Sequence, residues 1–266
     1  VDDTPVSLLL DREGNEILRL ETADISGLPK NWQWPEPVKL LAADGKTDIY
    51  GVVYRPSNFS PDQSYPVHDI SLALKEGHFM PAGSFTNSTT AGYRYLEPAA
   101  YAELGFIVVD ICGRGSSSRC RSFSAVPAPE LPSSHYQADR VAGIRQLAER
   151  YPYIDLDRVG VGGCVSTAAP VSGLLGYPDF YKVGVTNGAA IDLRLMAAFW
   201  GESYGDFPAS LNTRDFSHCY AKNLKGKLLI MHGMLSAAVN VAQAFSLIDA
   251  LQKANKDFDM LILPDD

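Results

Sequence analysis

The sequence predicts an α/β fold in which a mostly parallel central sheet carries helices on both faces, with antiparallel strands in its N-terminal part. Three observations predict it. From about residue 99 onward, apolar runs of strand length alternate with segments of helix length, as in sheets with crossover helices. Before residue 71 the strand-like runs follow one another without helices. Residues 157–170 have the layout of a strand, a sharp turn and a helix.

Composition limits the domain count and the classes of partner. A chain of 266 residues with 46% hydrophobic residues suits one large α/β domain or two small ones. The net charge of −8 argues against nucleic acid and anionic membrane surfaces as partners. The apolar runs are too short to span a membrane, and Val1-Asp2-Asp3 does not read as a signal peptide. The compartment in which the protein works stays open.

The cysteines give no metal or disulfide pattern. Cys112, Cys120, Cys164 and Cys219 are irregularly spaced and form no C-x-x-C pair, so free thiols are expected. A metal site built from Cys112, Cys120 and Cys164 would require the fold to gather them. We therefore predict no metal and no cofactor.

The N-terminal elements are expected to be strands. Residues 6–20 predict a hairpin around a turn at 11–15, and we interpret residues 1–30 as an appendage to a domain of residues 31–266. Three further strands are predicted at 38–41, 49–54 and 65–70. Antiparallel pairing is expected for these early strands because no helix separates them.

The remaining elements alternate. Residues 134–150 predict a helix with Ala138, Val141 and Ile144 on one face and Arg140 and Arg145 mostly on the other. The other expected elements are a helix at 98–104, strands at 106–111, 159–161, 183–186, 227–231 and 258–263, and helical segments at 193–200 and 241–254. This is the order of an α/β-hydrolase sheet.

The stretch at 157–170 is typical of a nucleophile elbow, in which glycines permit the strained turn that presents the nucleophile. The usual pattern is G-x-S-x-G, whereas this chain has Gly162-Gly163-Cys164-Val165-Ser166. A thiol at this place is a strong nucleophile if the following helix lowers its pKa. Pro170, with Gly173 and Gly176, is expected to weaken that helix.

Short motifs occur along nearly the whole chain: Trp34-Pro35-Glu36-Pro37-Val38, Asp48-Ile49-Tyr50-Gly51, Gly113-Arg114-Gly115, Asp157-Arg158-Val159-Gly160, Tyr177-Pro178-Asp179-Phe180-Tyr181-Lys182, Phe199-Trp200-Gly201-Glu202 and His232-Gly233. Taken together, they resemble the catalytic domain of the prolyl oligopeptidase family of serine peptidases, in its dipeptidyl-peptidase-IV-like branch. The resemblance implies that the first 30 residues derive from the end of a β-propeller.

The catalytic positions implied by the resemblance carry unusual residues. The nucleophilic serine falls on Cys164, the aspartate after the His-Gly motif falls on Ser236, and the oxyanion-binding tyrosine falls on Leu72. The histidine would follow strand 258–263 within a few residues, and the sequence stops at Pro264-Asp265-Asp266, so a histidine beyond residue 266 stays open. Of the other histidines, only His78 would lie near the pocket in this family.

The residues expected around the pocket are small or apolar. Gly163, Val165, Met196, Trp200, Ala238 and Val239 are the predicted pocket residues, and Leu72, Phe199 and Met234 are further wall candidates that could equally belong to the core. Small residues at the rim are Ala73, Ser166, Ala168, Ala169, Ala189, Ala190, Ala197 and Ala237.

Three functional hypotheses follow. The first is a hydrolase-family domain with a degenerate triad that no longer hydrolyses its substrate. The second is a hydrolase that uses Cys164 as nucleophile on esters or peptides. The third is a pocket that has diverged to bind a small apolar ligand. A peptide or a small molecule is the expected partner, and a homodimer stays open.

Overall fold

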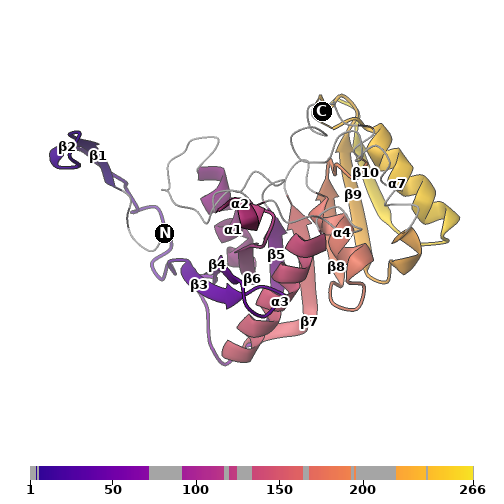
Figure 1. Cartoon of the computed structure of the whole chain (residues 1–266), viewed down its shortest axis with the longest axis horizontal. Coiled ribbons are helices and arrows are strands. Elements are labelled where there is room, and N and C mark those ends of the chain that lie inside the picture. The colour runs from indigo at the N-terminus through magenta and orange to yellow at the C-terminus, as the bar shows by residue number, and fades with distance from the viewer. Residues whose placement is uncertain are drawn as a thin grey trace.

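The computed structural model describes Thr4 and residues 6–71, 92–116, 120–124, 134–163, 168–192, 195, 220–237 and 239–265. In these residues one sheet of eight strands forms the centre of the molecule, in the order β10-β9-β8-β7-β5-β6-β4-β3 (Figure 1). The strands are β3 (Glu36–Leu41), β4 (Asp48–Tyr54), β5 (Tyr65–Ser71), β6 (Ile107–Cys112), β7 (Ile154–Gly163), β8 (Val183–Asn187), β9 (Lys227–Gly233) and β10 (Asp259–Leu263).

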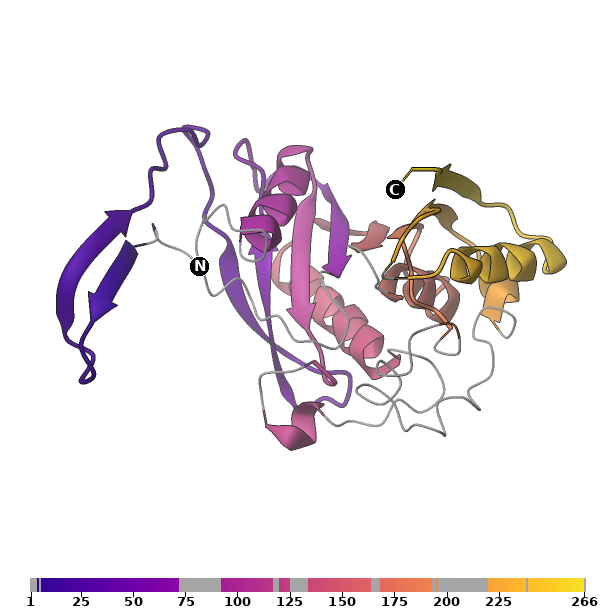
Figure 2. The ribbon, with the colours of Figure 1, turned by 90° about the horizontal axis from the view of Figure 1, so that it is seen from above.

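Helices cover both faces of this sheet. Helix α1 (Gly92–Glu103) lies on one face, whereas α3 (Ser134–Arg150), α4 (Ala169–Gly176) and α7 (Ala242–Lys253) lie on the other (Figure 2). Two short elements, α2 (Arg121–Ser124) and the 3₁₀ helix η3 (Ala221–Asn223), complete the described helices. The predicted α/β-hydrolase class is confirmed.

The core has two parts, which match the two faces. The larger part joins β-branched and leucine side chains of the sheet to α3, α4 and α7, among them Ile107, Ile144, Leu174 and Leu247. The smaller part lies under α1 and contains Val52, Tyr54, Ile70, Ala99, Ala102 and Val108. Apolar side chains on both faces of the central strands explain why these strands have nearly continuous apolar sequences.

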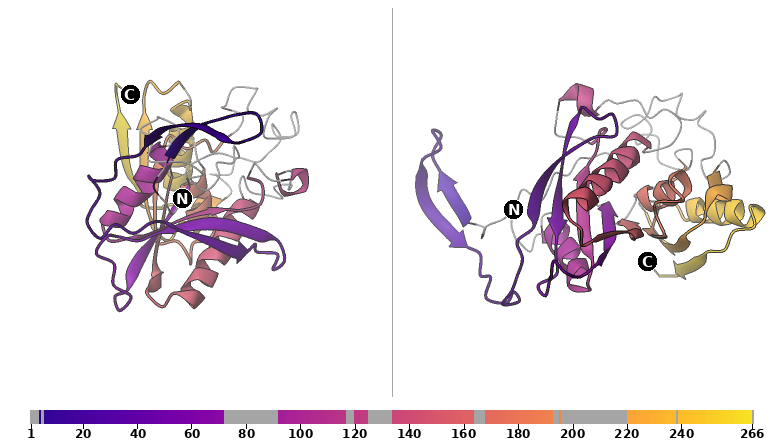
Figure 3. Two further views of the ribbon diagram at one scale, coloured as in Figure 1. Left: turned by 90° about the vertical axis from the view of Figure 1, so that its left-hand side faces the viewer. Right: turned by 90° about the horizontal axis from the view of Figure 1, so that it is seen from below.

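The N-terminal hairpin forms a sheet of its own. Strands β1 (Val6–Leu10) and β2 (Glu16–Thr22) pair in antiparallel register, as the sequence predicted. Every residue of both strands is exposed, and the hairpin projects from the central sheet (Figure 3). The domain boundary at residue 30 stays a prediction.

The expected pairing of β5 was wrong. Strand β3 pairs with β4, and β4 with β6, in antiparallel register, but β5 pairs with both β6 and β7 in parallel register. Helix α1 precedes β6, so a crossover lies between β5 and β6 and permits the parallel arrangement.

Two expectations about helices were also wrong. Arg140 does not lie on the outer face of α3 but is fully buried against the sheet. Pro170 lies in the first turn of α4, where its missing N–H has no helical acceptor to lose. Helix α4 therefore accommodates Pro170 without a kink.

Candidate active site

The candidate site lies at the carboxyl edge of the sheet, between β5 and β7. Strand β5 lies between β6 and β7 in the sheet. The chain passes from β5 to β6 on one side and then crosses back to β7 on the other side, so the direction of the strand order reverses here. In open α/β sheets such a reversal leaves a crevice outside the carboxyl ends of the two strands, where ligands bind. Here Ser71 pairs with Gly163, so these two ends lie side by side.

The residues that would carry the chemistry follow directly from these ends. Leu72 comes after Ser71, and Cys164 comes after Gly163. Six of the predicted site residues lie outside the described part of the chain: Leu72, Cys164, Val165, Met196, Trp200 and Ala238. The described ones are Gly163, which is partly exposed, Ser236 and Val239.

The strand leading to Cys164 packs closely on its neighbour. A Cβ atom built on Gly162 would lie 2.5 Å from Cε1 of His68, so the imidazole ring occupies the place of a side chain. The ring also packs against Tyr101 of α1, with 4.7 Å between ring centroids. Burial lowers the pKa of His68 to about 4, and this ring is neutral at neutral pH. His68 is thus a structural residue beside the strand that leads to Cys164.

Ser236 occupies the position expected for the catalytic acid, in the loop between β9 and α7. Its hydroxyl accepts a hydrogen bond from the Val239 N–H, and its own N–H donates to the Gly233 carbonyl, both at 3.4 Å. No aspartate or glutamate occurs between His232 and Asp249. The hydroxyl of Ser236 therefore holds the loop, and no carboxylate of this loop can orient a base.

His232, from the His-Gly motif, also fastens this loop. The ring is 1% exposed, and its Nε2 lies 2.9 Å from the Val239 carbonyl oxygen. A carbonyl oxygen can only accept, so Nε2 carries the proton. His232 and Ser236 together fix Val239, which is fully buried and cannot form an open wall of a pocket.

The end of β8 is tied to α7 by a buried amide. The Oε1 atom of Gln243 accepts hydrogen bonds from the Ile191 and Asp192 N–H groups, at 2.7 and 2.8 Å. Ala189 and Ala190, which the sequence placed at the rim, are buried beside this contact, and Ala168 and Ala169 are buried at the start of α4. These four alanines therefore belong to the core, whereas Ala237 is exposed.

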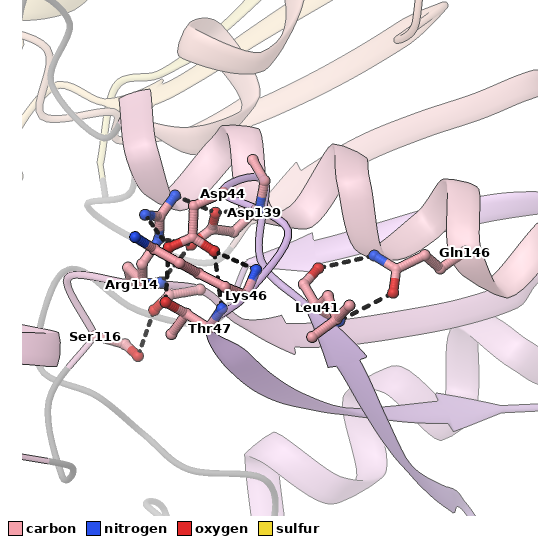
Figure 4. Close-up of polar contacts among 10 residues, drawn as sticks. Leu41, Asp44, Lys46, Thr47, Arg114, Ser116, Asp139 and Gln146 are labelled. Atoms are coloured by element: carbon pink, nitrogen blue, oxygen red, sulfur yellow. Dashed lines mark hydrogen bonds and ion pairs between the residues drawn. The ribbon is translucent and has the colours of Figure 1, made fainter.

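The Gly-Arg-Gly motif after β6 anchors a second group of loops. Arg114 binds Asp139 of α3 through Nε and Nη2, at 2.9 and 2.8 Å, and Asp44 through Nη1 at 2.9 Å (Figure 4). Asp139 also accepts from the Ala43 and Arg114 N–H groups. These bonds raise the pKa of Arg114, and they give the motif a structural role rather than a catalytic one.

A depression at the opposite edge of the sheet is separate from this site. It has a volume of about 310 Å³ and is lined by Asp179, Lys182, Lys225, Gly226 and Lys227, at the amino ends of β8 and β9. Lys182 and Lys225 both bind Asp179. The depression is therefore a surface feature far from the ends of β5 and β7.

The described residues contain no group of three metal-ligating side chains, and no helix among them is long and apolar enough to cross a membrane. Cys112 is partly buried and Cys120 exposed, both as free thiols. Cys164 and Cys219 lie outside the described residues.

The interpretation of the sequence overlooked a buried cluster around Arg140 next to the site. Arg140 lies four residues before Ile144 and seven before Leu147, a spacing that places all three on one helix face. The helical period therefore indicated that Arg140 shares the buried face of the helix. The assumption that an arginine faces solvent led to the wrong prediction.

The comparisons with known proteins agree with this geometry. The model of the prolyl oligopeptidase family matches residues 92–266. Human dipeptidyl peptidase 8 is 28% identical over 253 residues, which are 91% of this chain and 27% of that protein. A crystal structure of a "putative dipeptidyl aminopeptidase IV" from Bacteroides ovatus is 28% identical with a TM-score of 0.82, over 97% of this chain and 36% of that one.

A more distant structure supports the fold alone. Porphyromonas gingivalis dipeptidyl peptidase 4 has a TM-score of 0.78 at 22% identity, over 99% of this chain and 37% of its own. The chain thus spans between about a quarter and two fifths of the length of these relatives.

Proposed function

Because the chain belongs to the prolyl oligopeptidase family, we propose that it is a dipeptidyl-peptidase-like hydrolase domain with a degenerate triad, which does not hydrolyse peptides through the family mechanism. The observation that carries the proposal is the environment of Ser236. A hydroxyl stands where the family has a carboxylate, and it is engaged with the backbone of its own loop.

The chemical consequence follows from the roles in a triad. The acid holds the imidazole in the correct tautomer and stabilises the imidazolium that forms when the nucleophile loses its proton. A serine hydroxyl carries no charge and cannot provide that stabilisation. In serine peptidases, neutralising the acid lowers kcat by about 10⁴-fold.

The other catalytic positions point in the same direction. The side chain of Leu72 has no polar hydrogen with which to bind an oxyanion, and the loss of one such donor costs about 10²- to 10³-fold in kcat. Cys164 is a thiol where the family uses a hydroxyl. Changes at three catalytic positions of one site support loss of activity more strongly than any one of them does.

The test uses the purified chain with an X-Pro p-nitroanilide and, separately, p-nitrophenyl acetate. We expect no release of nitroaniline above the buffer rate, either by the wild type or by Cys164→Ala. The matched variant Ser236→Asp, which restores a carboxylate, is expected to stay inactive because Leu72 and Cys164 remain. Amide turnover by the wild type that disappears in Cys164→Ala would contradict the proposal.

A cysteine hydrolase is the second candidate, favoured by the place of Cys164. It follows Gly163 at the crevice between β5 and β7, where the family's nucleophile stands. Ester hydrolysis that vanishes in Cys164→Ala, with the X-Pro amide unchanged, would support this candidate. The third candidate, a pocket for an apolar ligand, depends on Met196 and Trp200, which lie outside the described residues; it stays a prediction.

A further inference from the structure

Strands β5 and β6 separate before they end. Their parallel pairing covers Val67 to Asp69 opposite Ile107 to Val109. Beyond this point Ile70 and Ser71 pair with β7, while Ile111 and Cys112 pair with β4. The carboxyl ends of the two strands therefore diverge, and carbonyl groups on their facing sides need other partners.

Arg140 of α3 occupies the opening between these ends. Its Nη2 donates to the Ile70 carbonyl at 2.6 Å, and its Nη1 donates to the Ile111 carbonyl at 2.7 Å. One rigid guanidinium thus binds both diverging strands at once, each through a backbone atom.

Charged partners hold the guanidinium in place. Its Nε donates to Asp69 Oδ1 at 2.8 Å, and Nη1 lies 3.5 Å from Asp110 Oδ1. The Tyr136 hydroxyl accepts from Nη1 at 2.7 Å. The side chains of Arg140 and Asp69 are both fully buried.

A further shell satisfies Asp69. Its Oδ2 accepts from the Tyr181 hydroxyl at 2.6 Å, and Gln137 donates to the same hydroxyl at 2.6 Å. Burial and the neighbouring carboxylate raise the pKa of Tyr181, so this hydroxyl keeps its proton as a donor. The cluster therefore connects β5, β6, α3 and the segment before β8.

Net stability does not explain such a cluster, because apolar side chains of similar volume often stabilise an interior as well as or better than a buried ion pair. Geometry does explain it. We propose that Arg140 is a positioning residue, which sets the separation of the carboxyl ends of β5 and β6 and thereby the place from which residue 72 and the loop after β6 begin. This inference rests on the proposed function only for the location of the site, and it does not depend on whether the site is active.

The chain contains its own reporter of this separation. Cys112 follows Ile111 directly and is partly buried, whereas Cys120 is exposed in the following loop. Labelling by iodoacetamide, followed for each cysteine by mass spectrometry, measures how often the end of β6 opens. No substrate or turnover is needed, so this readout is independent of the proposed function.

In Arg140→Lys the charge remains but the fork that binds two carbonyls is lost. We expect labelling of Cys112 to become about fivefold faster, which corresponds to a local opening easier by about 1 kcal/mol. Cys120 is already exposed, so its rate should not change.

The control for general destabilisation is Ile144→Val, one turn further along the same helix face. Its global stability is compared with that of Arg140→Lys by urea unfolding. A Cys112 rate that rises no more in Arg140→Lys than in Ile144→Val, after correction for that stability, would overturn the proposal. If the lysine variant does not fold, Asp69→Asn replaces it, because it weakens the anchor on β5 while keeping its shape. An unchanged Cys112 rate in that variant would likewise overturn the proposal.

Discussion

Two glycines of β7 face the same side of the sheet and differ in what lies above them. A Cβ at Gly162 would meet the His68 ring at 2.5 Å, whereas a Cβ at Gly160 would find its nearest atom, the Val183 carbonyl oxygen, at 3.6 Å. Of these two positions, only residue 162 must therefore be a glycine, because the His68 ring leaves no room for a side chain there.

This contrast predicts the effect of two matched substitutions. Gly162→Ala should lower the free energy of unfolding by about 1 to 3 kcal/mol, because the buried ring must move in a packed interior. Gly160→Ala should change it by less than about 1 kcal/mol, because the added methyl group would make an ordinary van der Waals contact and no neighbouring atom would have to move. Urea unfolding of both variants measures the difference, and equal losses would show that the ring moves freely.

His68 itself predicts how stability depends on pH. Its pKa is about 4 in the folded chain and 6.5 in the reference state, chiefly because burial disfavours the charged ring. Between these values the unfolded chain binds more protons, so stability falls as the pH drops from about 6.5 to about 4. The interval allows His68 to contribute up to about 3 kcal/mol.

The variant His68→Leu isolates this contribution from that of the carboxylates. The difference in unfolding free energy between wild type and variant should be constant above pH 7 and should shift against the wild type below about pH 6. A difference that stays constant down to pH 4 would mean that folding does not lower the pKa of His68.

At the scale of elements, helix α3 connects the loops of the N-terminal strands to the rest of the sheet. Its Asp139 binds the Arg114 side chain and two backbone N–H groups, and Gln146 exchanges two hydrogen bonds with the backbone of Leu41. Asp139 is fully buried, and the Arg114 guanidinium is its ion-pair partner.

Asp139→Asn should therefore lower the free energy of unfolding by about 1 to 3 kcal/mol, because it removes the buried carboxylate partner of Arg114 and leaves only Asp44 to pair with that guanidinium. The matched control is Asp179→Asn, whose side chain is 84% exposed and pairs with Lys225. That change should cost less than about 1 kcal/mol. Chemical unfolding of both variants checks the contrast, and similar losses would contradict it.

The elements themselves were largely predictable. The bounds of α3 were predicted correctly, because an apolar stripe continues through its whole length. Strand β7 proved longer than expected, starting at Ile154 instead of Val159. The residues before Val159 are mostly polar, so only their position beside β5 shows that the strand begins there. Neighbours in space decide such boundaries, and sequence periodicity does not contain them.

At the scale of the whole molecule, two groups of exposed apolar side chains stand out among the described residues. The hairpin exposes Leu9, Ile17 and Leu20, and the strands β8 and β10 expose Val183, Val185 and Leu261. The last three side chains share one face of the sheet by register, on the side opposite to α4 and α7. This distribution is compatible with the homodimer left open by the sequence, which stays a prediction.

The sequence by itself determined the class of the fold, the order of its strands and helices, and the place where a nucleophile would stand. These follow from local patterns, because apolar periodicity, glycine pairs and motif spacing depend only on residues that are close in the sequence. It also predicts that Cys164, Ser236 and Leu72 stand at the family's catalytic positions, and this assignment stays a prediction.

Only the tertiary structure decided how the polar groups are used. It placed β5 in parallel register between β6 and β7, buried Arg140 between diverging strand ends, and engaged the Ser236 hydroxyl with Val239. A charged or hydroxyl side chain can face water or satisfy a distant backbone group. For Arg140, which of these happens depends on partners about 30 to 70 residues away along the chain, whose positions are set by the packing of the whole sheet.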